Sequence, residues 1–140
     1  MKNVLLVLSV CALALPAITS AKDRKATLAP EPIVVNRSLF GGSESGLYDF
    51  GWLKPDCSTE FADVWIVRPP ESGDIRFEEA TSVVAGEKTD VQRLCHGKSG
   101  KVVRLFYKSK DNFTGRDRFV LDVDTKLGFV KRYAFTVDVR

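Results

Sequence analysis

The sequence predicts an all-β fold, an antiparallel sandwich of about seven strands with one disulfide. Short runs in which apolar and polar residues alternate recur along the chain, and turn-forming residues separate them. No long stretch has the 3.6-residue period of an amphipathic helix. Two cysteines remain once a predicted export signal is removed. Apolar residues make up 44% of the chain and charged residues 28%, which excludes a disordered, collagen-like or multi-pass membrane protein.

The first 21 residues predict a cleavable signal peptide. Lys2 precedes an apolar run over residues 4–18, and Thr19-Ser20-Ala21 supplies small residues before charged Lys22. The alternative is an uncleaved anchor, but Pro16 cuts the run short of the roughly 20 apolar residues that span a bilayer. We therefore expect cleavage after Ala21, no stable membrane span, and a periplasmic or secreted protein. The remaining 119 of the 140 residues suit one domain.

Residues 22–54 are expected to be an N-terminal linker and an aromatic loop region, ahead of a sandwich domain over residues 55–140. Residues 22–32 combine charges with two prolines, and residues 33–35 form a short apolar run that suits a first strand. A glycine- and serine-rich loop over residues 41–46 leads into three aromatic side chains, Tyr48, Phe50 and Trp52. We expect these aromatics to cap the core; if exposed, Tyr48 and Trp52 are candidate binding residues.

From residue 55 onward the strands follow in order. The apolar run Val64–Val67 ends at Pro69-Pro70, which blocks a strand from continuing. Alternation then predicts strands around residues 75–77, 91–95, 103–107, 119–123 and 129–139. On the last strand Phe129, Tyr133, Phe135, Val137 and Val139 are expected to share the apolar face, and residues 125–128 to form a hairpin turn in which Gly128 can take a positive φ.

The two cysteines of the expected mature chain, Cys57 and Cys95, are predicted to form a disulfide. An even cysteine count in an exported chain indicates such a bond. A loop of 38 residues should gain about 4 kcal/mol of stability in the chain-entropy model. The alternative is a metal or redox site that adds His96, the only histidine. Adjacent strand residues point to opposite faces, so Cys95 and His96 would not share a ligand sphere. No metal and no cofactor are expected.

A longer pattern lies around the predicted corner that leads into the 119–123 strand. Its residues are Tyr107, Phe113, Gly115, Asp117 and Phe119, and Pro70, Gly73 and Ile75 form a second turn pattern upstream. The pattern resembles bacterial Ig-like and cadherin-like repeat domains, over roughly residues 64–139, with Ser109 where the family has proline. The resemblance implies an Ig-like sandwich.

Turn chemistry explains each motif residue. Gly115 can take the positive φ of a tight bend, Asp117 can accept hydrogen bonds from loop amides, and Phe113 and Phe119 can anchor the corner in the core. The motif is therefore expected to form the fold. Calcium, which cadherin-like arrays hold between neighbouring domains, is not expected in a single copy.

Charge is unevenly distributed along the chain. Residues 22–92 carry 8 basic and 13 acidic side chains, whereas residues 93–140 carry 12 basic and 5 acidic ones. If their strands are neighbours, Arg104 and Arg132, with Lys101 and Lys108 nearby, would form a basic side suited to an anionic partner. The alternative is that these charges keep the protein soluble and blunt its edge strands. Nucleic acid is not an expected partner, because no motif that reads it is present.

The sequence holds no catalytic constellation, and we expect no enzyme. His96 lies in a predicted turn, no Gly-x-Ser-x-Gly elbow exists, and the adjacent Glu78 and Glu79 would point apart on a strand. Two hypotheses follow. The first is an exported binding or adhesion module of the bacterial envelope that engages a protein or an anionic envelope polymer. The second is a periplasmic structural or accessory subunit that pairs with another envelope protein, by strand addition. The oligomeric state stays open.

Overall fold

The structure is a computed structural model that describes residues 30–140. The predicted signal peptide, its cleavage after Ala21 and most of the predicted linker lie outside the described residues. Within residues 30–140, no helix is both long and apolar enough to cross a membrane.

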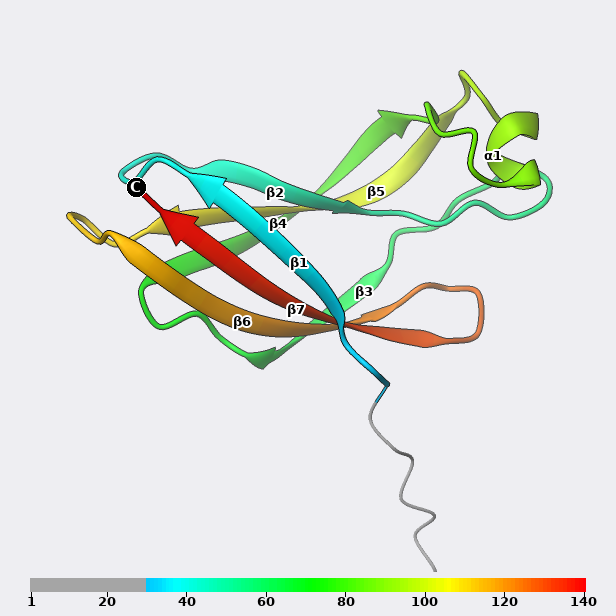
Figure 1. The fold of residues 1–140 in the computed structure, drawn as a ribbon. Coiled ribbons are helices and arrows are strands. Elements are labelled where there is room, and N and C mark those ends of the chain that lie inside the picture. Colours follow the sequence, from blue (N-terminus) through cyan, green and yellow to red (C-terminus); the bar gives the residue numbers. More distant parts are fainter. Residues whose placement is uncertain (1–29) are drawn as a thin grey trace, which may run out of the picture.

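Seven strands form two sheets that lie one over the other, which confirms the predicted sandwich (Figure 1). The four-stranded sheet has the order β1-β7-β6-β3, and the three-stranded sheet has the order β2-β5-β4. The strands are β1 (Ile33–Leu39), β2 (Ser45–Phe50), β3 (Asp63–Arg68), β4 (Gly73–Val83), β5 (Ser99–Ser109), β6 (Gly115–Asp124) and β7 (Val130–Val139). One short helix, α1 (Asp90–Leu94), lies between β4 and β5.

The strand order is that of an immunoglobulin-type sandwich. In chain order, the second, fifth and fourth strands make one sheet, and the third, sixth and seventh strands belong to the other. The pairing of β1 departs from the fully antiparallel expectation, because β1 runs parallel to β7, with Val35 opposite Phe135. A parallel pair is possible here because β1 and β7 are far apart in sequence and no hairpin has to join them.

The sandwich begins earlier than the boundary expected at residue 55. Both β1 and β2 lie before that residue, and each is the edge strand of one sheet. The glycine-rich segment between them carries the chain from one sheet to the other. The expected first strand at residues 33–35 is confirmed and extends to Leu39, whereas the aromatic residues Tyr48 and Phe50 lie in β2 rather than in a loop.

Alternating side chains of both sheets fill the core, as the sequence predicts. Leu105 and Tyr107 on β5 face Phe119 and Leu121 on β6, and all four are fully buried. Phe135 on β7 stacks on Phe119, with ring centroids 4.8 Å apart. Phe129 is the exception to the expected apolar face, because it precedes β7 and is exposed in the turn that joins β6 to β7. The predicted turn itself is present, and Gly128 has a φ of +89°.

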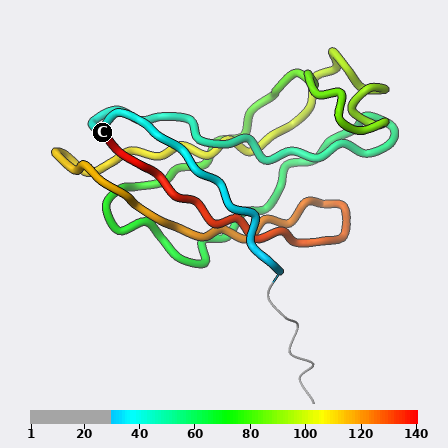
Figure 2. The backbone as a smooth tube through the Cα atoms, viewed as in Figure 1, coloured from blue at the N-terminus to red at the C-terminus, as the bar shows by residue number. Residues whose placement is uncertain are grey.

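Residues 90–94 form a helix, so the strand expected over 91–95 is wrong. Thr89 is the N-cap residue: its hydroxyl accepts a hydrogen bond from the backbone N–H of Gln92. The Gln92 side chain accepts one in return from the backbone N–H of Thr89. This reciprocal capping box gives hydrogen-bond partners to backbone amides that would otherwise lack them. It therefore favours a helix over the strand that the apolar alternation of residues 91–95 predicts. Figure 2 shows that α1 and the chain after β2 lie at the same end of the sandwich.

Candidate functional site

Asp117 holds together one end of the sandwich, as the motif predicts. Its buried carboxylate accepts hydrogen bonds from the backbone N–H groups of Glu71 and Ser72, each at 3.0 Å, and from that of Arg118 at 2.9 Å. The Tyr107 hydroxyl donates a fourth bond at 2.9 Å. These contacts tie the β3–β4 turn to β5 and β6, and we call this group the Asp117 corner.

The other motif residues support the same corner. Burial raises the pKa of Tyr107 above its ordinary value, and the hydrogen bond to Asp117 adds to the shift. Gly115 has a φ of +127°, where a side chain would be strained. A Cβ at Gly73 would overlap the Tyr107 ring, so the turn into β4 requires glycine there. Phe119 is fully buried, and Phe113 packs partly buried against the core.

The opposite end is closed by the predicted disulfide. Cys57 lies in the loop after β2, Cys95 caps the C-terminus of α1, and their Cα atoms are 5.5 Å apart. Cys57 has a φ of +66°, in the region that favours glycine, and its backbone N–H donates a hydrogen bond of 2.9 Å to the Lys54 carbonyl. A cleft of about 220 Å³ lies beside this link, with Trp52, Thr59, Gln92 and Lys101 among its lining residues. We call this region the disulfide end.

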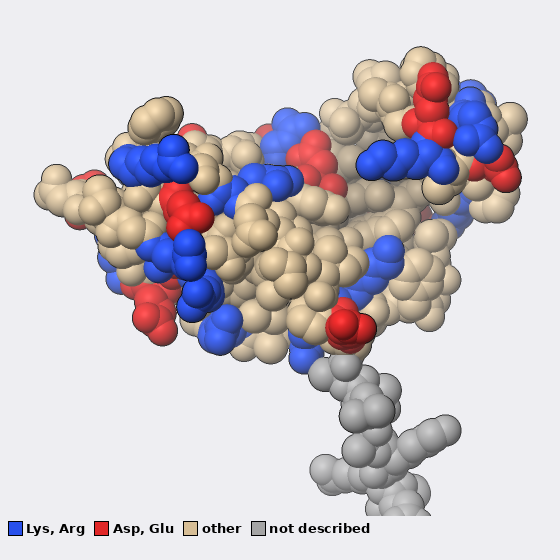
Figure 3. Space-filling view, in the orientation of Figure 1, with Lys and Arg blue, Asp and Glu red and all other residues tan. Residues whose placement is uncertain are grey.

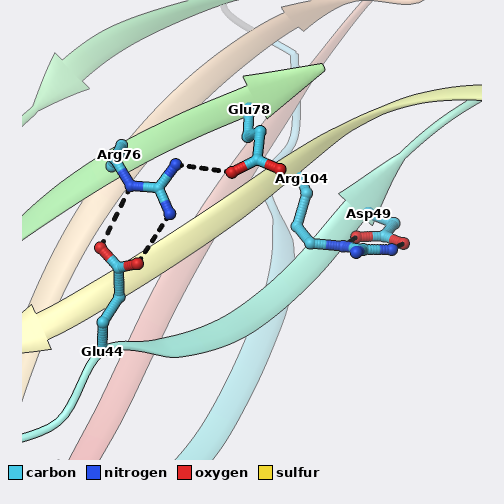
Figure 4. Close-up of polar contacts among 5 residues, drawn as sticks. All are labelled: Glu44, Asp49, Arg76, Glu78 and Arg104. Carbon is cyan, nitrogen blue, oxygen red and sulfur yellow. Dashed lines mark hydrogen bonds and ion pairs between the residues drawn. The ribbon is translucent and has the colours of Figure 1, made fainter. Parts of the chain in front are cut away.

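Arg104, a candidate binding residue, lies on the outer face of the three-stranded sheet and binds a carboxylate of the neighbouring strand (Figure 4). Its guanidinium donates two hydrogen bonds to the Asp49 carboxylate, both 2.8 Å long. Beside it, Arg76 binds Glu44 and Glu78. Because of these bonds, the pKa of Arg104 is raised by Asp49 and the pKa of Glu44 is lowered by Arg76. Arg104 is therefore half of a neutral pair.

Arg132, the second candidate, lies on the other sheet. It donates two hydrogen bonds of 2.7 Å to Asp122 on the neighbouring strand β6. Because β5 and β7 belong to different sheets, Arg104 and Arg132 point out of opposite sides of the sandwich. The strands that carry Arg104 and Arg132 are therefore not neighbours, and the two arginines do not form the shared basic side that the sequence analysis considered. Figure 3 shows Asp and Glu side chains interspersed among the Lys and Arg side chains of the face in view.

Two lysines complete the expected basic side. Lys108 is exposed on the outer face of β5. Lys101 lies near the start of the same strand, with its Nζ 5.2 Å from the centre of the Phe61 ring. Lys101 is at the disulfide end, whereas Lys108 is close to the opposite end of β5. The structure therefore spreads the four basic candidates over two sheets and both ends of the molecule.

The aromatic candidates pack toward the core. Phe50 is fully buried, and the Tyr48 ring lies 5.5 Å from the Tyr133 ring, measured between centroids. Trp52 is half-buried against the core, with Lys131 Nζ 5.8 Å from its ring centre. These side chains cap the core, in line with the first of the two expectations for them.

The strand β3 carries a surface that the sequence analysis did not single out. It is an edge strand, bonded to β6 on one side and to no described strand on the other. Three consecutive large apolar side chains, Trp65, Ile66 and Val67, are each about half exposed, at 49%, 50% and 48%. The signal was present in the sequence: an unbroken apolar run followed by two prolines is typical of an edge strand, because proline cannot donate to a further ladder.

A groove of about 350 Å³ runs beside this edge, between β3 and β4. Val64 from β3, Phe77 from β4 and Val103 from β5 supply its apolar lining. Its charged lining residues are all acidic, namely Asp63, Glu78 and Glu79. Asp63 binds Lys126, and Glu78 binds Arg76 at 2.8 Å. We use the name β3 edge for residues 63–68 together with the groove.

The opposite flank of the sandwich is formed by β1 and β2, and its edges are protected in part. The β2 strand has a bulge between Gly46 and Tyr48. The Leu47 carbonyl accepts a hydrogen bond of 3.0 Å from Arg37 Nε of β1. A bulge and a bridging arginine block the pairing of a further strand. Among the described edge strands, β4 is protected in another way, because charged residues such as Asp74, Arg76 and Glu79 stand along it.

His96 is exposed, with Nε2 3.8 Å from a Glu87 carboxylate oxygen. Within residues 30–140, no group of three or more His, Cys, Asp or Glu side chains is placed to hold a metal ion. The disulfide occupies both cysteines of the alternative metal site, which leaves His96 without the thiolates that site requires.

Comparisons with known proteins found no match among protein-family models, curated proteins or solved structures.

Proposed function

We propose that this chain is a non-enzymatic module of the bacterial cell envelope that binds protein by strand addition to the β3 edge. The export part of the proposal rests on the leader pattern of residues 1–21. The non-enzymatic part rests on a single histidine in an exposed position and on turn motifs that already account for the Asp117 corner. This proposal follows the second hypothesis of the sequence analysis, an accessory subunit that pairs with another envelope protein, and it assigns the pairing to the β3 edge.

The observation that carries the proposal is the half-exposed apolar run Trp65–Val67 on an unpaired edge. An edge strand presents unpaired N–H and C=O groups, and soluble proteins usually protect such edges with charges, prolines or bulges. A short apolar edge beside an apolar groove suits a protein partner, since main-chain hydrogen bonds supply affinity and pockets for alternate side chains supply specificity.

The alternative of an anionic envelope polymer has less support. Such a polymer requires cations free to bind it along one surface. Arg104 and Arg132 are each held by two hydrogen bonds to an aspartate and lie on different sheets. Tyr48 and Trp52 pack toward the core and offer no exposed aromatic loop.

A site-specific photo-crosslinking experiment tests the proposal. A photoreactive amino acid replaces Trp65 in the full chain, expressed with its leader in a bacterial envelope and irradiated in the cells. Val34 is the matched control position: it is an apolar residue, 64% exposed, on the opposite edge of the same sheet. We expect a discrete protein adduct from position 65 and little from position 34.

Salt separates the two kinds of partner. Association through main-chain hydrogen bonds and apolar contacts should survive 0.5 M salt, where exposed charges are screened over a few ångströms. Equal adducts from positions 65 and 34, or none from position 65, would contradict the proposal. Loss of the position-65 adduct in high salt would mean that exposed charges, and not strand addition, hold the partner.

A further inference from the structure

We propose that the partner at the β3 edge is a second copy of this chain, paired antiparallel about a two-fold axis at Trp65. The inference rests on the proposed function for the surface that it uses and adds the identity of the occupant. Two properties of β3 lead to this inference: the sheet face to which each of its side chains points, and the positions of its two charged residues, Asp63 and Arg68.

The register of β3 against β6 shows which side chains of β3 point into the core and which point outward. Val64 and Ile66 lie opposite Val123 and Leu121, which are fully buried, so they point between the sheets. Asp63 and Trp65 lie opposite Asp124 and Asp122, on the outer face. A bulge at Val67 then places Arg68 opposite Val120, which also belongs to the outer face. From Asp63 to Arg68, the side chains therefore point outward, inward, outward and inward, followed by the bulged Val67 and then by Arg68, which points outward.

This order is self-complementary. Directly opposite residues of an antiparallel pair point to the same face. With Trp65 on the two-fold axis, it faces Trp65 of the second copy, and Val64 faces the second copy's Ile66. Because the bulge lets Arg68 take the next outward position, Asp63 faces the second copy's Arg68. In this pairing, opposite residues point to the same face of the joined sheet. Asp63 of each copy also forms an ion pair with Arg68 of the other copy.

Other registers lose this match. A shift by one residue places outward Trp65 against an inward side chain, which flips the apolar set to the wrong face. A shift by two residues keeps the faces but leaves Asp63 or Arg68 unpaired with the opposite strand. Pro69 and Pro70 end the ladder at Arg68, because neither has a backbone N–H. Six residues are therefore available, and the Trp65-centred register pairs five of them and leaves only the bulged Val67 without an opposite residue.

The charges favour this occupant as well. None of the ion pairs among residues 30–140 includes Arg68, so the second copy's Asp63 would supply its carboxylate. Asp63 already binds Lys126 and would then lie between two cations. Exposed ion pairs add little affinity but fix register. A six-residue edge is a small interface, so we expect a reversible dimer with a dissociation constant on the order of 10 μM.

Sedimentation velocity of the exported chain, purified after removal of the predicted leader, tests the inference from about 1 to 500 μM. The chain should pass from monomer to dimer across this range. Arg68→Glu creates two like-charge pairs across the axis, and Asp63→Arg does the same with the opposite sign. Each variant alone should associate about tenfold more weakly or worse. Arg93→Glu, which breaks an exposed ion pair with Asp90 far from β3, is the matched control and should dimerise like the natural chain.

Mixing the two variants gives the decisive measurement. Asp63 of the Arg68→Glu chain faces Arg68 of the Asp63→Arg chain, and the two introduced charges also face each other with opposite sign. The mixture should therefore regain dimer that neither variant forms alone, an effect that simple misfolding cannot produce. A chain that stays monomeric at 500 μM, or a mixture no more associated than its components, would overturn the inference.

A third variant locates the axis. In Trp65→Cys the introduced thiols meet at the two-fold axis, where opposing Cβ atoms lie about 5 Å apart, and oxidation should link two copies. Ser38→Cys on β1 should not link. The pure protein contains no envelope partner, so a monomer here contradicts self-pairing alone. The proposed function then still stands if the position-65 photo-adduct contains another protein, and it fails if no adduct forms.

Discussion

At one end of the sandwich the β3–β4 turn is tied to β6 by the carboxylate of Asp117, and at the other end the loop after β2 is tied to α1 by a disulfide (Figure 1). The Asp117 corner is built from residues on or next to regular strands, and its four hydrogen bonds are independent of redox conditions. The disulfide end is built from loops and a five-residue helix, and its link is lost on reduction.

The strand β3 lies between these two closures. It begins a few residues after Cys57 and ends just before the turn whose amides bind Asp117. Both ends of β3 are therefore anchored, although one of its edges is free. A strand held in this way is already in its paired conformation, which lowers the entropy cost of adding a partner strand. If β3 adds a partner strand as proposed, closure of the two ends holds its edge ready for that strand.

The largest expected effect comes from Asp117→Ala. This change leaves three backbone N–H groups and the buried Tyr107 hydroxyl without their acceptor. We expect the free energy of unfolding to fall by about 5 kcal/mol, as measured by chemical denaturation. Tyr107→Phe is the matched control: it removes one donor and keeps the ring, so it should cost about 1 kcal/mol. Equal losses in the two variants would mean that the Tyr107–Asp117 hydrogen bond, and not the bonds to the backbone amides, accounts for the effect of the carboxylate.

The second effect comes from removal of the disulfide in the double variant Cys57→Ala, Cys95→Ala. The closed loop spans 38 residues, and its loss should lower the free energy of unfolding by about 4 kcal/mol in the chain-entropy model. Hydrogen exchange shows whether the two ends open separately. Amides of residues 84–98 should lose protection, whereas those of Glu71 and Ser72 should keep theirs. Loss of protection at both ends together would show that the sandwich opens as one unit.

The strands and the Asp117 corner were predictable from sequence because each depends on local chemistry. The alternation that ends in Phe119, Leu121 and Val123 places those side chains in the core whatever the partner strand is. Gly115 begins β6 next to a turn and Asp117 binds the amides of the β3–β4 turn, and at turns residue type determines conformation. The disulfide followed from the expected export of the chain and from the two cysteines that remain after the predicted leader.

What could not be predicted depends on which strands become neighbours. Arg104 and Arg132 look like free cations in the sequence, because Asp49 and Asp122 meet them only across strand pairs. The exposure of residues 65–67 likewise depends on β3 being the last strand of its sheet. The helix α1 is a different case, since Thr89 and Gln92 have the spacing of a capping box and the apolar alternation of residues 91–95 concealed it.

The smallest effect is expected from Thr89→Ala, at the disulfide end. The change removes the acceptor for the Gln92 amide and should lower the free energy of unfolding by about 1 kcal/mol. Thr89→Ser keeps the hydroxyl and should be close to neutral; a loss equal to that of alanine would assign the effect to the methyl group instead.

The same substitution also tests how the disulfide end is organised. A helix of five residues is too short to persist without tertiary support, so the cap can contribute only while the disulfide holds Cys95 in place. In the variant that lacks both cysteines, Thr89→Ala should therefore have almost no further effect on the free energy of unfolding. Additive losses, measured in a double-mutant cycle, would show that α1 forms independently of the disulfide. The disulfide end would then resemble the Asp117 corner, with hydrogen bonds sufficient to hold it.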